Sequence, residues 1–126
     1  MDGNQYEEVK APPMKLSWSN VSYDLQIPYS KKQRIDLGTE DKSYWKQIVK
    51  PQSGYANHGE TLFIMGSSGA GKTSFLNLLC DRIPSSRKNK LQGEVLLNDS
   101  LKVSQSNFGK YGAYVMQDDI LFQTLT

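Results

Sequence analysis

Residues 61–83, TLFIMGSSGAGKTSFLNLLCDRI, constrain the fold of this chain more than any other segment. The apolar run 61–65 predicts a short strand, residues 66–71 predict a glycine-rich turn, and an amphipathic pattern predicts a helix over 72–83. The turn has the spacing G-x-x-x-x-G-K-[ST], and a strand before it and a helix after it are the context that this spacing requires. The sequence therefore predicts a phosphate-binding loop in an α/β fold.

Three properties of this loop suit a nucleoside triphosphate. Gly66, Gly69 and Gly71 can adopt positive φ and have no Cβ, so backbone N–H groups can converge on one phosphate. The helix that follows adds free N–H groups and the positive end of its dipole. Lys72 supplies a cation for the terminal phosphates, and the Thr73 hydroxyl is a hard oxygen ligand for Mg²⁺. We expect a Mg²⁺–nucleoside triphosphate site; the alternative is a glycine turn with no ligand.

Length and composition limit the other possibilities. With 126 residues, the chain is long enough for one domain with a hydrophobic core and too short for two ordinary ones. The 15 Lys and Arg against 13 Asp and Glu leave a net charge of only +2, which gives no reason to expect a nucleic-acid partner. Cys80 is the single cysteine, which predicts a reducing compartment and a small buried side chain. The sequence shows no signal peptide and no apolar run of the roughly 20 residues that a membrane helix needs.

The chain before the loop predicts strands and turns. Residues 1–14 are polar, carry the pair Pro12-Pro13 and show no periodicity, which is typical of a flexible leader. Partial alternation over 16–27 predicts an edge strand or two strand pieces that end at Pro28. Residues 29–43 are charged and aperiodic and predict a surface loop, in which Lys31, Lys32 and Arg34 are more consistent with solvent than with an anionic lipid contact. A strand is expected over 44–49 and is ended by Lys50 and Pro51, with turns marked by Gly54, Asn57, His58 and Gly59.

The chain after the helix predicts two further strands. Pro84 is expected to end the helix, with Arg82 in its last turn, and a polar loop follows over 85–90. Gly93 precedes a predicted strand over 94–97 and a turn over 98–100. A buried strand over 111–116 would deliver Gln117 at its carboxyl end, where open α/β sheets bind ligands.

These segments together resemble the nucleotide-binding domain of ABC transporters, in particular the White-type or G subfamily. The resemblance rests on IMGSSGAGKTSFLNLL (64–79), GEVLLN (93–98) and YVMQDDILFQTLT (114–126), and it covers about residues 15–126. It implies a P-loop NTPase fold of class α/β, in which an incomplete ABC ATPase core carries an amino-terminal antiparallel β subdomain. Residues 15–126 would then be the amino-terminal half of the domain, truncated before its signature and Walker B elements.

The resemblance also implies roles for individual residues. Residues 66–73 would be the Walker A loop, and Gln117 would be the Q-loop glutamine that helps hold Mg²⁺ and the attacking water. Lys72 and Gln117 are therefore the expected catalytic residues, and Thr73 and Gln117 the expected metal ligands. The residues expected to contact the nucleotide are Gly66, Ser67, Ser68, Gly69, Ala70, Gly71, Lys72, Thr73 and Ser74. Tyr23 is a candidate for stacking on adenine, although Leu25 stands where such domains often carry an aromatic residue.

The carboxylates that triphosphate hydrolysis needs have no clear match in the sequence. A Walker B element is four apolar residues, an Asp and the catalytic Glu. Asp99 and Asp118 each follow apolar residues, but Asn98 and Gln117 intervene. No LSGGQ-like signature and no switch histidine are found either. We therefore expect the chain itself to bind nucleotide without turning it over.

Three functions follow as hypotheses. The first is ATP binding within an ATP-driven ABC transporter that exports lipids or other hydrophobic substrates. The resemblance implies that such a protein pairs this domain with a second nucleotide-binding domain, in a homo- or heterodimer, and with its own transmembrane domain at the cytoplasmic face of a membrane. The second is a nucleotide-binding module without turnover. The third is a guanylate-kinase-like P-loop kinase, whose second-substrate residues should follow the helix, where only the short loop 85–90 is found.

Overall fold

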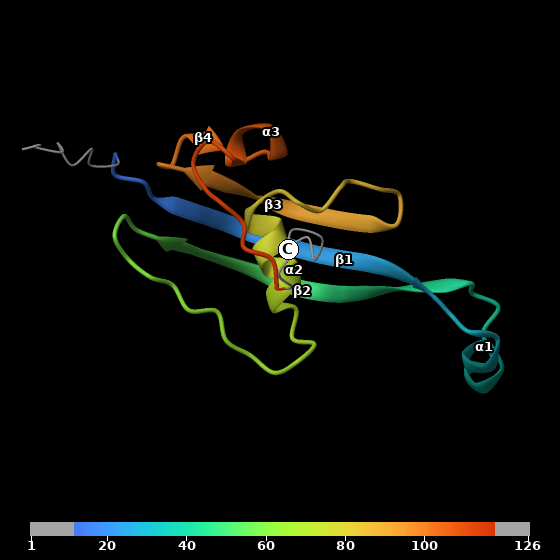
Figure 1. The fold of residues 1–126 in the computed structure, drawn as a ribbon. Helices are drawn as coiled ribbons and strands as arrows, with labels where there is room; N and C mark the ends of the chain where they lie inside the picture. The colour runs from blue at the N-terminus through green and yellow to red at the C-terminus, as the bar shows by residue number, and fades with distance from the viewer. Residues whose placement is uncertain (1–11, 118–126) are drawn as a thin grey trace, which may run out of the picture.

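A computed structural model describes residues 12–117, in which three short helices accompany a four-stranded antiparallel sheet of order β2-β1-β3-β4 (Figure 1). The elements in chain order are β1 (Leu16–Pro28), α1 (Lys31–Leu37), β2 (Ser43–Ala56), α2 (Lys72–Leu79), β3 (Asn89–Leu97), β4 (Leu101–Lys102) and α3 (Gln105–Phe108). The sheet corresponds to the antiparallel β subdomain that the sequence predicts. No helix within residues 12–117 is long and apolar enough to cross a membrane.

Strand β1 is a central strand and not the predicted edge strand, because it pairs with both β2 and β3. It is also continuous. The apolar positions change phase after Trp18, and the structure accommodates this change with a register shift between Trp18 and Val21, where Asn20 has a φ of 49°. Such a bulge inserts one residue and returns the later side chains to the same face of the sheet. The predicted end at Pro28 is confirmed.

Strand β2 continues through Pro51, where the sequence predicts its end. Val21 pairs with Gln52 and Tyr23 with Val49. The paired residues are three positions apart in β2 but only two apart in β1, so β2 contains one extra residue here. Pro51 therefore lies in a bulge of a strand at the edge of the described sheet, which is a position that tolerates a missing N–H group. Gly54 lies in the strand instead of a turn, and a Cβ at this position would lie 2.6 Å from Cζ2 of Trp18.

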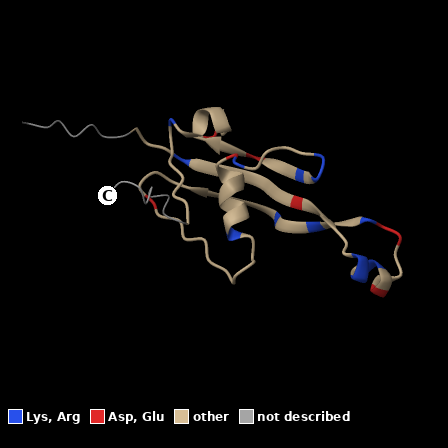
Figure 2. Ribbon diagram, turned by 45° about the vertical axis from the view of Figure 1, so that its right-hand side comes forward, with Lys and Arg blue, Asp and Glu red and all other residues tan. Residues whose placement is uncertain are grey.

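The segment predicted as a charged surface loop contains helix α1. Its ends are defined by local capping, which hydrophobic periodicity does not reveal. The Ser30 side chain accepts a hydrogen bond from the Gln33 N–H group, the Gln33 side chain accepts one from the Ser30 N–H group, and Gly38 ends the helix at a φ of 62°. Lys31, Lys32 and Arg34 lie on this helix, at the end of the β1–β2 hairpin and far from α2 (Figures 1 and 2).

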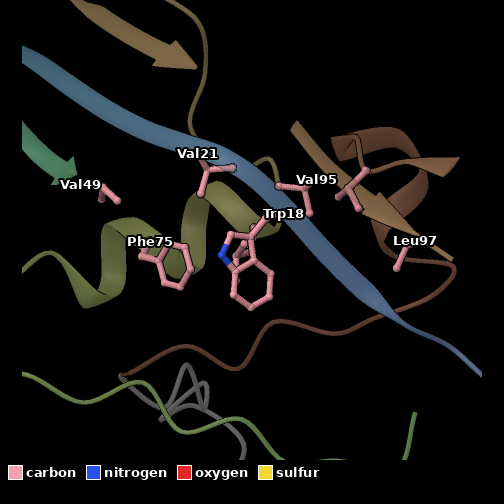
Figure 3. Close-up of a cluster of buried hydrophobic side chains, with 8 residues drawn as sticks. Trp18, Val21, Val49, Phe75, Val95 and Leu97 are labelled. Atoms are coloured by element: carbon pink, nitrogen blue, oxygen red, sulfur yellow. The ribbon is translucent and has the colours of Figure 1, made fainter. Parts of the chain in front are cut away.

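Helix α2 packs across β1 and β2 and completes the hydrophobic core (Figure 1). Its buried Phe75 meets Trp18 edge to face, with ring centroids 5.7 Å apart and planes inclined by 73° (Figure 3). The buried core residues are Trp18, Val21, Val49, Phe75, Leu79, Val95, Leu97 and Val103. The helix ends at Leu79, four residues before the predicted end, since Asp81 adopts a left-handed φ of 52° before Pro84 is reached.

Two predicted strands are not formed in the described part of the chain, namely 61–65 and 111–116. Phe63 is 78% exposed, Met65 88% and Val115 91%, so neither segment is buried. A strand needs a neighbouring strand for its backbone hydrogen bonds, and the described sheet provides none to these segments. Helix α3 was not predicted, because four residues are too few to show a helical period. The predicted turn over 98–100 is confirmed as the link between β3 and β4.

Candidate functional site

The glycine-rich loop depends on backbone conformations that favour glycine. Gly69 and Gly71 have φ values of 80° and 91°. A Cβ on Gly71 would lie 2.5 Å from the carbonyl oxygen of Ile48, so the loop runs directly against β2. Within the loop, the Ala70 N–H group donates to the Ser67 carbonyl at 3.1 Å. The loop is therefore ordered by its own turn and by β2, without a regular strand before it.

The start of α2 offers the backbone donors that a phosphate group requires. Gly71 is its N-cap, and no side chain among residues 12–117 caps this end of the helix. The first intrahelical bond is donated by the Phe75 N–H group to the Gly71 carbonyl, at 2.8 Å. The N–H groups of the first turn lie before that bond and have no helical acceptor. An uncapped helix start directly behind a glycine turn fits an anionic ligand such as a triphosphate.

Lys72 folds back over the loop. Its ammonium group donates to the carbonyl oxygens of Gly66 at 2.8 Å and Ser67 at 2.7 Å. These two bonds close the turn from residue 66 to residue 72 and place a positive charge above it. The cation expected to meet the terminal phosphates therefore lies at the mouth of the loop.

Thr73 and Gln117, the two predicted metal ligands, line the same depression of about 600 Å³. Both residues are exposed. The chain thus brings together two oxygen-bearing side chains separated by more than forty residues in sequence. The remaining walls are formed by Leu76, Asn77, Arg82, Tyr114, Val115 and Met116. An amide oxygen and a hydroxyl are ligands suited to Mg²⁺ alongside phosphate oxygens.

Arg82 and Tyr114 were not identified as site residues from the sequence. Arg82 lies beyond the end of α2, and its guanidinium carbon is 4.4 Å from the centroid of the Tyr114 ring. The prediction that Arg82 lies in the last turn of its helix is therefore wrong. The signal that was available is the position of Tyr114, three residues before Gln117.

The other residues considered from the sequence lie away from the glycine-rich loop or take part in the packing of the fold. Tyr23 packs against the core, and it lines neither the depression beside Thr73 nor a second one of about 620 Å³ between β2 and the loop. His58 lies in a turn, as predicted, and its Nδ1 accepts from the Met14 N–H group at 3.3 Å. Burial raises the pKa of the Cys80 thiol, and Arg82 lowers it by less.

Asp99 is engaged in holding the β3–β4 turn. It accepts from the Lys15 ammonium group at 2.9 Å and from the Ser17 hydroxyl at 3.0 Å. Those two hydrogen bonds lower the pKa of the Asp99 carboxyl, Lys15 contributing most. Asp118, the other aspartate considered for a Walker B role, lies outside the described residues, as do Asp119 and residues 1–11.

Comparison with known proteins gives one consistent result. A family model described as "ABC transporter" matches residues 49–126, more than half of the chain. ABC transporter G family member 18 of Arabidopsis thaliana is 37% identical over 120 residues, covering 94% of this chain and 16% of the relative. ABC transporter G family member STR of Medicago truncatula is 40% identical over 124 residues, covering 98% of this chain and 14% of the relative. The chain thus spans about one sixth of the length of the curated relatives it matches.

Proposed function

The chain belongs to the ABC transporter family, and from this premise we propose that residues 66–74 bind ATP together with Mg²⁺. The observation that carries the proposal is the uncapped start of α2 behind a turn in which Gly69 and Gly71 have positive φ. The N–H groups of this turn and of the first helical turn would hold the phosphates, with Ser67, Ser68, Ala70 and Ser74 in the same stretch. Lys72 would exchange its two carbonyl acceptors for phosphate oxygens.

The proposed metal site consists of the Thr73 hydroxyl and the Gln117 amide oxygen, which line one depression. Bound Mg²⁺ would neutralise part of the phosphate charge and fix the triphosphate in one arrangement. Thr73 would then orient the metal from the helix, and Gln117 from the segment that follows α3. This assignment gives Lys72 and Gln117 the roles that the sequence predicts for them.

The proposal also concerns the larger protein to which this nucleotide-binding segment would belong. We infer that residues 1–14 are a leader and that residues 15–126 form the first half of a nucleotide-binding domain. Two such domains would enclose ATP and drive the export of a lipid or another hydrophobic substrate through a transmembrane domain, at the cytoplasmic face of a membrane. The G family names of the relatives support this proposal, as does the pairing of the loop with Gln117.

The binding site is tested by titrating the purified chain with Mg²⁺–ATP and measuring the heat of binding by calorimetry. Lys72→Ala should weaken binding by about tenfold or more, because a hydrogen bond to a charged group is lost. Lys110→Ala removes the same charge from a residue that lines neither depression beside the loop, and should leave affinity within about twofold. Equal affinity of Lys72→Ala and the unchanged chain would refute the proposed site.

Turnover by the chain itself is a separate question. We propose that it holds ATP without hydrolysing it, because Asp99 is engaged by Lys15 and Ser17 and no segment of the sequence matches the Walker B pattern. A phosphate-release assay on the purified chain should therefore remain at the background rate. Steady release that disappears in Lys72→Ala would contradict this.

A further inference from the structure

The residues directly after α2 bind two later parts of the chain. The Asp81 carboxylate accepts from the Gln105 N–H group at 3.0 Å and so holds the start of α3. The Arg82 guanidinium stacks over the ring of Tyr114, 4.4 Å from its centroid. One short turn, fixed by the left-handed φ of Asp81, therefore connects the helix of the phosphate loop to the segment that leads to Gln117.

Tyr114 is the anchor of that segment. Of residues 111–117, Tyr114 alone is half-buried and the other six are exposed. A second attachment lies just before it, where the Gly112 N–H group donates to the Phe108 carbonyl at 2.9 Å. A Cβ on Gly112 would lie 2.8 Å from Cζ of Phe108, so the backbone runs against that ring. Residues 115–117 make no hydrogen bond to α2.

The Arg82–Tyr114 pair also forms part of the site wall. Both residues line the depression that holds Thr73 and Gln117. Both also line a neighbouring depression of about 430 Å³, bounded by Gln105 and Phe108 of α3. The pair therefore stands between the two depressions. If the stacking were lost, the two depressions would no longer be separated by this pair. Residues 115–117 would also lose the contact through which Tyr114 connects them to Arg82.

We propose that Arg82 and Tyr114 are positioning residues for the metal site. Their stacking holds the segment 114–117 against α2, so that Gln117 faces the same bound Mg²⁺ as Thr73. The inference rests on the proposed function, since it needs ATP and Mg²⁺ to bind there. Neither residue is assigned a contact with the nucleotide; each acts through the position of Gln117.

The test measures how strongly Mg²⁺ increases the affinity of the purified chain for ATP, as the ratio of the dissociation constant in EDTA to that in Mg²⁺. Arg82→Gln and Tyr114→Leu should lower this ratio by about two- to fivefold, the range for an exposed cation–π contact. Their affinity in EDTA should be unchanged. Tyr114→Phe keeps a ring for the guanidinium and should retain the ratio. Arg87→Gln removes a cation that lines neither depression and controls for net charge.

Two further measurements separate positioning from a general loss of structure. In a Gln117→Ala background, Arg82→Gln should not lower the ratio any further, because both changes affect the same interaction. In the chain labelled with 3-fluorotyrosine, the ¹⁹F resonance that Tyr114→Phe removes should move toward the free amino acid in Arg82→Gln, without any nucleotide present. The resonances of the other tyrosines should stay in place.

The outcomes distinguish this inference from the proposed function. ATP binding that is insensitive to Lys72→Ala refutes the proposed site, and the positioning role falls with it. Binding that depends on Lys72, together with a Mg²⁺ ratio unchanged by Arg82→Gln and Tyr114→Leu, refutes the positioning role alone. A loss of affinity in EDTA as large as the loss in Mg²⁺ would also overturn it, since the pair would then support the fold in general.

Discussion

The antiparallel sheet and residues 57–71 ahead of α2 differ in what fixes their backbone. In the sheet, every strand has a partner, and the residues of one face pack on α2 (Figures 1 and 3). Residues 57–71 have no strand partner in the described part of the chain, and Phe63 and Met65 are largely exposed. Their course is set instead by Gly71 against the Ile48 carbonyl and by the two bonds of Lys72. The glycine-rich turn thus takes its shape without a regular strand before it.

This difference predicts where the chain is sensitive to substitution. Side chains in the sheet contribute through burial, so truncation there should cost stability. Phe63 and Met65 are exposed and should contribute little to stability despite their hydrophobicity, whereas Ile64 in the same run packs against the core. The four predictions below are measured as free energies of unfolding in urea, by circular dichroism, and run from the largest effect to the smallest.

Trp18→Ala should cost about 3–5 kcal/mol, because it removes the largest side chain of the core and leaves a cavity beneath Phe75. Trp18→Phe is a milder variant and should keep the fold at a smaller cost. Trp45→Ala is the matched control. Trp45 is 42% exposed, and the Nζ atom of Lys90 lies 4.1 Å from the centroid of its ring. Its truncation should therefore cost about 1 kcal/mol or less. Similar costs for the two alanine variants would mean that the sheet has no defined core at Trp18.

Gly93→Ala should cost about 2–3 kcal/mol. Gly93 has a φ of 83°, and a Cβ there would meet the Ser19 carbonyl oxygen and lie 2.5 Å from the carbonyl carbon of Asn20. Gly38→Ala also places alanine at positive φ, 62°, but with no atom within 4 Å, so about 1 kcal/mol is expected. The difference between the stability losses of the two variants measures the cost of the steric clash where β1 and β3 approach closely. Equal stability losses would mean that the positive φ alone accounts for the cost of Gly93→Ala, with no contribution from the clash.

Asp99→Asn should produce a small loss of stability that depends on pH. Hydrogen bonds from Lys15 and Ser17 lower the pKa of Asp99 in the folded chain. The stabilisation is therefore present above the unfolded pKa and is lost as the pH falls through the lower, folded pKa. Asn suits the left-handed φ of 56° at this position. The variant and the unchanged chain should differ at neutral pH and converge as the pH falls through the lowered, folded pKa of Asp99. A difference that grows on acidification would contradict this assignment.

Met65→Ser should change stability by less than about 0.5 kcal/mol, because Met65 is 88% exposed. The sequence predicts a short strand here, and if that strand were buried the same truncation would cost about 2–5 kcal/mol. Val95→Ser, in β3, provides that comparison, since Val95 is only 8% exposed. A cost for Met65→Ser close to that of Val95→Ser would favour the buried strand over the exposed segment.

Local signals predicted the parts of this fold that local chemistry determines. The spacing from Gly66 to Thr73 gave the turn and the start of α2, and Pro28 and residues 98–100 gave the ends of strands. Apolar runs were less reliable, because a run predicts burial only where another element covers it. Residues 61–65 and 111–116 have the composition of buried strands, but the described chain offers them no neighbour.

The site was predictable only one segment at a time. The loop follows from its own residues, and Gln117 follows from a family resemblance, but neither indicates what holds them together. Arg82 and Tyr114 are separated by more than thirty residues, and a cation and an aromatic ring at that distance carry no periodic signal. Helix α1 was missed for a related reason, since Ser30 and Gln33 define its start by hydrogen bonds and not by hydrophobicity.

The bulge at Pro51 also bears on how the chain behaves in concentrated solution. Strand β2 lies at one edge of the described sheet, with exposed Lys46 and Lys50 beside a proline that has no N–H group to offer. On the opposite side, the two-residue β4 pairs only with Leu96 and Leu97, so the earlier part of β3 forms the rest of that edge of the described sheet. An unpaired strand edge is where a second copy of a chain adds on by hydrogen bonding, and charge, proline and shortness each discourage that addition. The same irregularity that lets β2 continue past Pro51 thus makes the β2 edge a poorer template for pairing with a second copy of the chain.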